Sequence, residues 1–400
     1  MIKKISTQQL QVGMYVHDLD ADWMAHNFLR NRFPVKNEKI VDKILKSGIK
    51  HIYIDTSMGS DLDDAPTAEE VMRDVETETV QVAETHDGME KQVSVAEEFE
   101  HARTVYKEAH NVMRNLMEDI RLGKQVEVEA VEPIAEKMIG SIFRNKDALI
   151  SLSRIKNKDE YTFMHSVGVA GLMITFARAV GLDADTIHQV AVGGLLHDIG
   201  KMMVPDEILN KPGRLTEEEF KIMKTHVVHS REILSTKAGI TPAALDVAAQ
   251  HHERIDGTGY PLGLKGDEIS TVGQMSTIVD VYDALTSVRV YKNAWEPTDA
   301  LKKLLEWSPS HFRVEQVHQF IRCLGIYPIG TLVELESGRV GIVFEQGEQD
   351  LLRPTVRVIY HARHKCYLPV KQLDLARHTD DRILYAVSPE KYGIDLGAFM

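Results

Sequence analysis

Histidines and aspartates gather in one helical stretch of this chain, between Tyr161 and Asp280, and each of them lies in apolar company. A buried imidazole or carboxylate is costly unless it is paired or bound to a metal, so the helices must fold in a way that brings these side chains together. The candidates are His165, His197, Asp198, His226, His251, His252 and Asp280. A single buried histidine is usually structural, but this many on consecutive helices indicate a shared metal site.

Helical periodicity separates the histidines that face the interior from those that face solvent. His165 shares a helix face with Val169 and Phe176, which places its imidazole on the core side. His226 lies close to the apolar side of its helix, whereas His229 falls nearer the solvent face. We therefore predict that His226 belongs to the site and that His229 is an ordinary surface histidine.

The candidate ligands combine imidazole nitrogens with carboxylate oxygens. This mixture suits iron, manganese, nickel or zinc and does not suit calcium. Six or seven ligands are more than one metal needs if a position is to stay open for water, so two metals that share Asp198 as a bridge, with His197 on the same ion, are the simplest arrangement. Such a pair lowers the pKa of a bridging water and holds both oxygens of an in-line phosphoryl displacement. We predict two divalent transition metals, with iron, manganese or nickel preferred and zinc as an alternative.

The motifs around these residues resemble the HD-GYP branch of the HD superfamily of metal phosphohydrolases. The adjacent pair His197 and Asp198 marks the superfamily, and HHERIDGTGYPLGLKG, from His251 to Gly266, is similar to the extended motif of the branch. The similarity continues through GKMMVPDEILNKPGRLT, DVYDALTS and the RxYK pattern at 289–292, and it covers residues 160–295.

The resemblance implies a phosphodiesterase that opens a cyclic dinucleotide, cyclic di-GMP or 3′,3′-cGAMP, to a linear dinucleotide through a metal-bridging hydroxide. It implies that all seven candidates above are metal ligands. It also implies that Asp198 and Lys201 are catalytic, that Lys201 reaches a substrate phosphate, and that Arg289 and Lys292 hold the other phosphate or a guanine.

Four positions depart from the family pattern. Members with three metals resemble one another in a glutamate four residues before the first ligand histidine, where this chain has Tyr161, so two metals are expected. Val227, Ser230 and Gln274 replace a proline, a glycine and an arginine that are common in the family. None of the three is an expected ligand, and the choice between the two dinucleotides stays open.

The loop that follows His252 is expected to position the site without taking part in the chemistry. Its glycines permit positive φ and close approach of the backbone, and Tyr260 is not expected to be catalytic. The residues expected around the ligands are Glu253, Asp256, Gly257, Gly259, Tyr260, Pro261 and Asp283.

The fold class is predicted to be mainly α, with an HD-type helical bundle as the catalytic domain. The predicted domains are a small mixed α/β regulatory module (1–57), an acidic linker (58–94), a long amphipathic connecting helix (95–130), the HD-GYP helical domain (131–326) and a small antiparallel β module (327–400). Strand-like alternation beyond Pro328 predicts the last of these. Residues 1–55 also resemble the small module that precedes many HD-GYP domains, through LQVGMYV and HIYID.

Negative charge is concentrated in the predicted linker and in the first residues of the helix predicted after it. Of the net charge of −13, the segment from Asp61 to Glu100 contributes −12, with 14 acidic side chains against two basic ones. Such a segment buries little apolar surface and is expected to be disordered or only loosely ordered. A polymeric nucleic acid partner is not expected, because duplex binding needs a basic stripe.

An apolar seam runs along the predicted connecting helix, at Phe99, Ala102, Tyr106, Ala109, Met113, Leu116 and Ile120. It predicts either a helix that packs on the next domain or a homodimer through residues 95–120, and the sequence leaves both open. The two cysteines, Cys323 and Cys366, have no disulfide or zinc-ribbon spacing, and no run of about 18 apolar residues is present. A soluble, cytoplasmic protein without membrane association is therefore expected.

Two other functions compete with the enzyme that the resemblance implies. A non-catalytic receptor for the dinucleotide would not need a full ligand set, which this chain retains. An HD-type phosphohydrolase that acts on mononucleotides is opposed by the GYP loop and by the cations at 289–292.

Overall fold

The computed structural model describes residues 1–399 except 22–27, 29–30, 85–90, 125–126, 154–160, 288–293, 309 and 349. The chain divides into two units, the first formed by Met1–Glu78 with Asp206–Met223 and the second by Thr79–Pro205 with Lys224–Met400. Among the described residues, no helix combines the length and the apolar character needed to cross a membrane.

The first unit is built on a four-stranded antiparallel sheet with the order β1-β4-β2-β3. Its elements are β1 (Ile2–Ser6), the turn η1 (Thr7–Gln9), β2 (Tyr15–Asp18), β3 (Phe33–Pro34), α1 (Glu38–Lys46) and β4 (His51–Asp55). Ile5 of β1 pairs with Ile52 of β4, and both side chains join Ile44 of α1 in an apolar core. This is the small mixed α/β module that the sequence predicts.

Helix α2 (Ala68–Glu84) corrects the expectation of a disordered or only loosely ordered linker. Its first turn is closed by a capping box, in which Glu70 Oε2 accepts from Thr67 N at 2.8 Å and Thr67 Oγ1 accepts from Glu70 N at 3.2 Å. Val82 and Ala83 are buried in its last turns. Glutamate is itself a good helix former, so the cap and the buried end outweigh the repulsion between the charges.

Helices dominate the second unit, as predicted. They are α3 (Val95–Arg121), η2 (Val128–Ala130), α4 (Glu132–Ser153), α5 (Tyr161–Ala179), α6 (Ala184–Leu196), η4 (Ile199–Met203), α9 (Pro242–Gln250), η5 (Gly266–Glu268), α10 (Thr271–Thr286), α11 (Pro297–Trp307) and α12 (Val314–Leu324). The short helix α7 (Asp206–Leu209) belongs to the first unit, and α8 (Glu217–Ser235) begins there and continues into the second.

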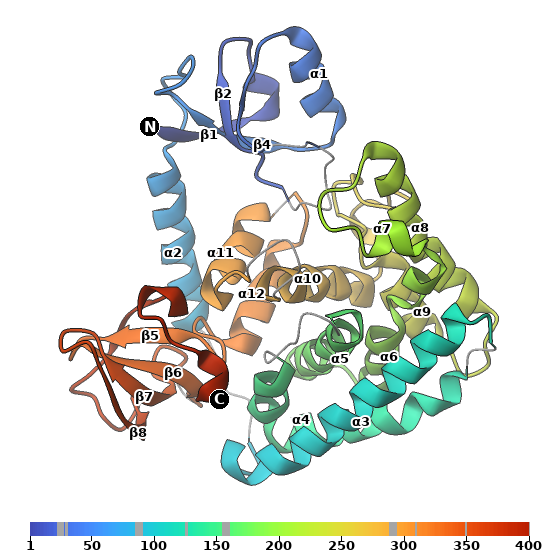
Figure 1. The fold of residues 1–400 in the computed structure, drawn as a ribbon, viewed down its shortest axis with the longest axis vertical. Coiled ribbons are helices and arrows are strands. Elements are labelled where there is room, and N and C mark those ends of the chain that lie inside the picture. The colour runs from blue at the N-terminus through green and yellow to red at the C-terminus, as the bar shows by residue number, and fades with distance from the viewer. Residues whose placement is uncertain are drawn as a thin grey trace. The chain divides into compact units, whose positions relative to one another are not determined.

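The apolar seam of α3 is covered within the chain. Helices α3 and α4 lie side by side (Figure 1), and α3 also packs on α5 and η4. Ala102, Ala109 and Met113 of the seam are fully buried by these neighbours. Packing on the next domain, the first of the two predicted roles, thus accounts for the seam, and a homodimer through residues 95–120 would need another face of the helix.

The second half of α4 is tied to the C-terminal sheet by a buried carboxylate. The backbone leaves helical geometry at Asn145, whose Nδ2 donates to the carbonyl of Val93 at 2.8 Å. Asp147, directly after this break, is fully buried and accepts from Lys146 Nζ at 2.7 Å and from the backbone N–H of Gln346 at 3.0 Å. Lys91 lies 3.5 Å from the same carboxylate.

A five-stranded antiparallel sheet with the order β8-β7-β6-β5-β9 ends the chain. Its strands are β5 (Leu332–Leu335), β6 (Arg339–Glu345), β7 (Thr355–His361), β8 (Cys366–Asp374) and β9 (Ile383–Ala386), followed by the turns η6 (Pro389–Lys391) and η7 (Leu396–Ala398). The first four strands coincide with the segments TLVEL, RVGIVFEQ, TVRVIY and CYLPV, whose alternation predicts strands. The sequence does not predict β9, which is defined by its pairing with β5.

Candidate metal centre

The seven predicted ligands lie together in the second unit, and each comes from a helix or from a helix end. His165 belongs to α5, His197 and Asp198 join α6 to η4, His226 belongs to α8, His251 and His252 follow the last residue of α9, and Asp280 belongs to α10. Nearly all of these side chains are fully buried, and the most exposed, that of His252, leaves 11% of its surface open. The structure thus brings all seven into one place.

Three of the imidazoles are held from behind through Nδ1. His197 Nδ1 lies 2.8 Å from the carbonyl of Gly194, and His251 Nδ1 lies 2.9 Å from that of Ala248. His165 Nδ1 lies 2.7 Å from Oδ2 of Asp283. A carbonyl or a carboxylate can only accept, so each Nδ1 donates its proton to this partner, and Nε2 is the ring nitrogen that faces the other ligands.

Asp198 lies between two groups of three ligands. Within each group the ligand atoms lie within 4.8 Å of one another; the groups, named here the first and the second trio, are His165, His197 and Asp280, and His226, His251 and His252. Asp198 Oδ2 is 3.5 Å from His165 Nε2 and 3.3 Å from His197 Nε2, on the side of the first trio. Asp198 Oδ1 is 3.5 Å from His226 Nε2 and 3.8 Å from His251 Nε2, on the side of the second.

The donor atoms of this cluster fit divalent transition metals. Asp198 Oδ1 and the Nε2 atoms of His197, His251 and His252 are buried and form no hydrogen bond with any residue that the structure describes. Buried polar atoms are rarely left without a hydrogen bond. Several that converge on one another, all nitrogen or carboxylate oxygen, are the donor set of iron, manganese, nickel or zinc.

Electrostatics favour the metal-binding forms of Asp198 and His251. Burial opposes the ionisation of Asp198, but Lys201 and His197 outweigh it and hold the pKa of this carboxyl well below its ordinary value. Burial, with the neighbouring His197, lowers the pKa of His251 to about 3. The carboxylate is therefore ionised and the imidazole neutral at physiological pH, as coordination requires. Lys201, expected at a substrate phosphate, has its Nζ in contact with Asp198 Oδ2.

Gly200 allows the turn after Asp198 to lie against α8. A Cβ at this position would lie 2.0 Å from the carbonyl oxygen of His226 and 2.4 Å from the backbone nitrogen of Ser230. The N–H of Gly200 also donates to Ser230 Oγ at 2.9 Å. The serine that departs from the family pattern thus fastens the turn that carries Asp198 to the helix that carries His226.

The glycine-rich loop is fastened to the backbone next to His252. Glu253 is buried, and its two oxygens accept from the N–H groups of Leu262 at 2.8 Å and Leu264 at 3.0 Å. Tyr260 N donates to the carbonyl of His252 at 3.1 Å. At Gly259 a Cβ would lie 2.5 Å from Glu253 Cα, so only glycine fits the close approach.

Asp256 shapes the tip of the same loop by accepting from the backbone and hydroxyl of Thr258 at 2.9 and 2.6 Å. It is followed by Gly257, whose φ of +79° suits glycine, and Pro261 follows Tyr260 at the exit of the loop. Gln274, another departure from the family pattern, donates to the carbonyls of Gly266 and Ile269 and so holds the far end of the loop. These contacts agree with a positioning role for the loop.

The sequence reasoning did not single out Lys224. The ring of Tyr260 lies 4.7 Å from that of His252, with 35° between the planes, and Lys224 Nζ lies 5.5 Å from the centroid of Tyr260. A cation at this distance attracts an aromatic ring. The only sequence signal is its place two residues before His226 in α8.

His229 does not belong to the cluster. His229 leaves 34% of its side chain exposed and pairs with Glu232, as expected of a surface histidine. Arg289 and Lys292 lie within 288–293, outside the described residues. Tyr161 is the first residue of α5.

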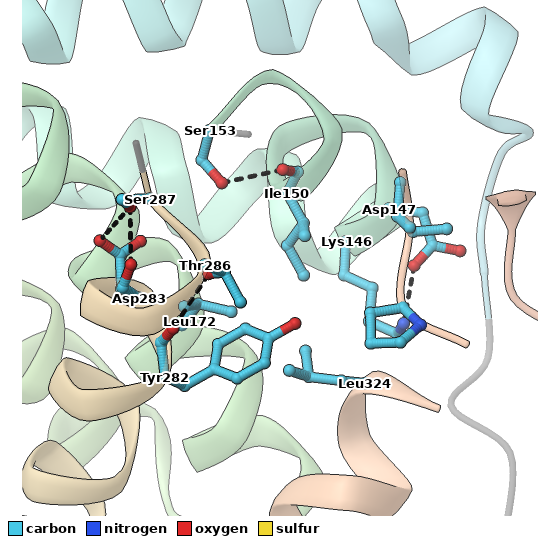
Figure 2. A pocket seen from close by; sticks show the side chains of 12 residues that line it. Lys146, Asp147, Ile150, Ser153, Leu172, Tyr282, Asp283, Thr286, Ser287 and Leu324 are labelled. Atoms are coloured by element: carbon cyan, nitrogen blue, oxygen red, sulfur yellow. Dashed lines mark hydrogen bonds and ion pairs between the residues drawn. The ribbon is translucent and has the colours of Figure 1, made fainter. Parts of the chain in front are cut away.

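Asp283, which holds His165, also lines a small pocket of the second unit (Figure 2). Ser287 Oγ donates to the carbonyl of Asp283 at 2.6 Å and lies 3.2 Å from its Oδ2. Lys146 and Asp147 line the same pocket. None of the seven predicted ligands does, so this pocket is distinct from the metal cluster.

Comparison with known proteins agrees with this geometry. The model of a domain of unknown function (DUF3391) matches residues 2–131, and that of the HD domain matches residues 138–313. The chain is 38% identical over 378 residues to the cyclic di-GMP phosphodiesterase PA4108 of Pseudomonas aeruginosa, which covers 94% of this chain and 90% of the relative. It is 33% identical over 192 residues to 3′3′-cGAMP-specific phosphodiesterase 2 of Vibrio cholerae, covering 45% of this chain and 37% of the relative.

A solved structure, that of Bd1817, a HDG"Y"P protein from Bdellovibrio bacteriovorus, matches with a TM-score of 0.46 and 19% identity over 80% of this chain and 98% of that one. The full-length similarity to the Pseudomonas protein is the stronger finding. With the HD pair between the two trios and the GYP loop fastened beside His252, it shows that this chain belongs to the HD-GYP family.

Proposed function

We propose that this chain is a metal-dependent phosphodiesterase that hydrolyses a cyclic dinucleotide, cyclic di-GMP or 3′,3′-cGAMP, to a linear dinucleotide. One observation carries the proposal: Asp198 turns one oxygen to each of two ligand trios. The relatives named above are a cyclic di-GMP phosphodiesterase and a 3′3′-cGAMP-specific phosphodiesterase. Both dinucleotides are therefore proposed as substrates.

Two divalent metals would be held by the two trios, with Asp198 as the shared ligand. When bound, such a pair would supply a water of lowered pKa. It would also neutralise negative charge on the phosphodiester during an in-line displacement of its leaving oxygen. Iron, manganese and nickel are preferred and zinc is the alternative, since first-row affinities overlap and availability decides among them.

The side chains of this protein supply position and charge. Asp283 and the carbonyls of Gly194 and Ala248 fix three imidazoles so that their Nε2 atoms converge. Lys201, at Asp198 Oδ2 and 15% exposed, is within reach of a phosphate that enters the cluster, and it would compensate the charge that develops there. Arg289 and Lys292 would hold the second phosphate or a guanine.

The test is turnover of a panel of cyclic dinucleotides by protein loaded with Fe(II), Mn(II), Ni(II) or Zn(II). We expect a linear dinucleotide as product from cyclic di-GMP or 3′,3′-cGAMP. Asp198→Ala should lower kcat by more than about a hundred-fold, since even residues behind metal ligands cost 10- to 100-fold. His229→Ala, a surface histidine on the helix of His226, is the matched control and should behave like wild type.

Two outcomes would favour the competing functions. A wild-type protein that retains both metals and binds the dinucleotide without turnover would be a receptor. Faster hydrolysis of a nucleoside triphosphate than of any cyclic dinucleotide would indicate a mononucleotide phosphohydrolase. A cytoplasmic location and a homodimer through residues 95–120 stay predictions.

A further inference from the structure

The segment Asp206–Met223, named here the bridging segment, joins two parts of the candidate site but packs with the N-terminal unit. In sequence it begins five residues after Lys201, and its last residue lies three residues before His226. From the sequence, this segment is predicted to belong to the helical domain 131–326. Its packing with residues 1–78 connects the N-terminal module to the surroundings of two site residues.

Contacts from two elements of the module hold the bridging segment. Arg214 donates to the backbone carbonyl of Phe28 and, at 2.7 Å, to Asn31 Oδ1. Lys43 of α1 lies 2.8 Å from Glu217 Oε1, and its Nζ also lies 5.1 Å from the ring centroid of Phe28. Phe28 is itself buried in the core of the module, so these contacts reach its folded interior.

The bridging segment is also tied to itself. Lys211 Nζ lies 2.8 and 2.6 Å from the two carboxylate oxygens of Glu219. Thr216 and Glu219 form the capping box that opens α8, with Thr216 N donating to Glu219 Oε2 at 2.7 Å. These contacts hold the segment together, so a displacement of Arg214 or Glu217 would also displace the first turn of α8.

Helix α8 would transmit a displacement of Glu217 to His226 in the second trio. Glu217 is its first residue, and His226 lies nine residues further along the same helix, a rise of about 14 Å at 1.5 Å per residue. A packed helix is stiff over this length. A ligand displaced by about 1 Å can cost two orders of magnitude in catalysis, so the position of Glu217 matters at His226.

On these observations, and resting on the function proposed above, we propose that the N-terminal module regulates the metal centre by holding the bridging segment. While Arg214 and Glu217 keep these contacts, His226 keeps its position beside His251 and His252. A ligand or protein that bound Lys43 or Asn31 in place of the segment would release the segment and speed the loss of metal from the second trio.

A charge exchange in the full-length, metal-loaded protein tests this. Lys43→Glu and Glu217→Lys each oppose like charges, and the double variant restores an opposite pair. For each single variant we expect hydrogen exchange of the amides of 206–223, and metal loss to a chelator, to rise by the same factor. That factor is about five, as for an exposed ion pair near the upper end of its usual strength. The double variant should return both rates toward wild type.

Two further variants complete the design. Arg214→Ala removes an independent contact and should raise both rates in the same way. Lys46→Glu, an exposed lysine on the same helix as Lys43, is the control and should change neither rate.

The proposal is overturned if the amides of 206–223 exchange faster while metal loss stays at the wild-type rate, because the segment would then be free of the centre. It is equally overturned if neither Lys43→Glu nor Arg214→Ala changes the exchange. Both results leave the proposed function standing, which fails only if wild-type protein turns over no cyclic dinucleotide.

Discussion

At the scale of single residues, helix faces were the strongest guide to the site. The contrast between His226 and His229, three positions apart in one helix, followed from which side of α8 is apolar, and in the structure His226 is fully buried while His229 pairs with Glu232. Periodicity gives the face of a side chain but not its partners. The sequence could therefore predict Asp283 only as a residue near the site. It could not predict that Asp283 contacts Nδ1 of His165.

Gly200 gives a stability prediction at this scale. Gly200→Ala forces a Cβ onto the backbone of α8, so the free energy of unfolding should fall by about 1–3 kcal/mol or more, as for overpacked cores. The measurement is urea unfolding followed by circular dichroism. Gly140→Ala in α4 is the matched control, because a Cβ there meets no atom within 4 Å, and it should stabilise the protein by about 0.4–1 kcal/mol. Equal stabilities of the two variants would contradict the close approach.

At the scale of elements, long helices with regular seams were predicted well and short or exposed elements were not. The seam of α3 and the strands β5 to β8 repeat their pattern over several turns or residue pairs. Helix α2 depends on one capping box and a buried last turn, and β9 depends on its pairing with β5. Tertiary contacts of this kind leave little trace in composition or period.

The pairing of α3 with α4 depends on Glu98. This buried carboxylate accepts from Arg144 Nε at 2.6 Å and from Ser141 Oγ at 2.7 Å. Burial would raise its pKa, but Arg144, Ser141 and His101 outweigh burial and lower the pKa below the ordinary 4.5. A lowered pKa means that this carboxylate stabilises the fold above about pH 4.5, and that the contribution is lost as the pH falls through the folded-state pKa.

Glu98→Gln should therefore destabilise the protein by about 1–3 kcal/mol at pH 7, the usual cost of disrupting a buried, charge-assisted hydrogen bond. The difference from wild type should shrink below pH 4.5. Urea midpoints from pH 3.5 to 7 measure it, with the exposed Glu100→Gln as control. If the difference in stability between Glu98→Gln and wild type grew toward low pH, the pKa of Glu98 would not be lowered in the folded protein.

At the scale of the whole molecule, the fold class was predicted from the sequence, but the grouping of segments was not. Residues 206–223 pack with the N-terminal module, although their motif belongs to the helical domain. Sequence neighbours usually share a unit, and an exception requires long-range contacts such as that of Arg214 with Asn31, 183 positions away. No local pattern encodes the partner of an exposed arginine.

Metal removal should lower the stability of the fold as well as the activity. A metal that binds only the folded chain stabilises it by about 2.7 kcal/mol when present at a hundred times its dissociation constant. Stripping with a chelator should therefore lower the midpoint of thermal unfolding, and adding back Mn(II) should restore it. Asp198→Ala should show a much smaller shift. An identical shift in that variant would place the stabilising metal elsewhere.

The span of chain that the ligands cover also has a consequence for synthesis. His165 and Asp283 lie 118 positions apart and meet at 2.7 Å, and the last ligand helix, α10, ends only at Thr286. Because domains fold as units during translation, no complete set of donors exists until that helix has left the ribosome. A metal that needs the complete set of donors would therefore be bound late, after most of the helical part has already been made.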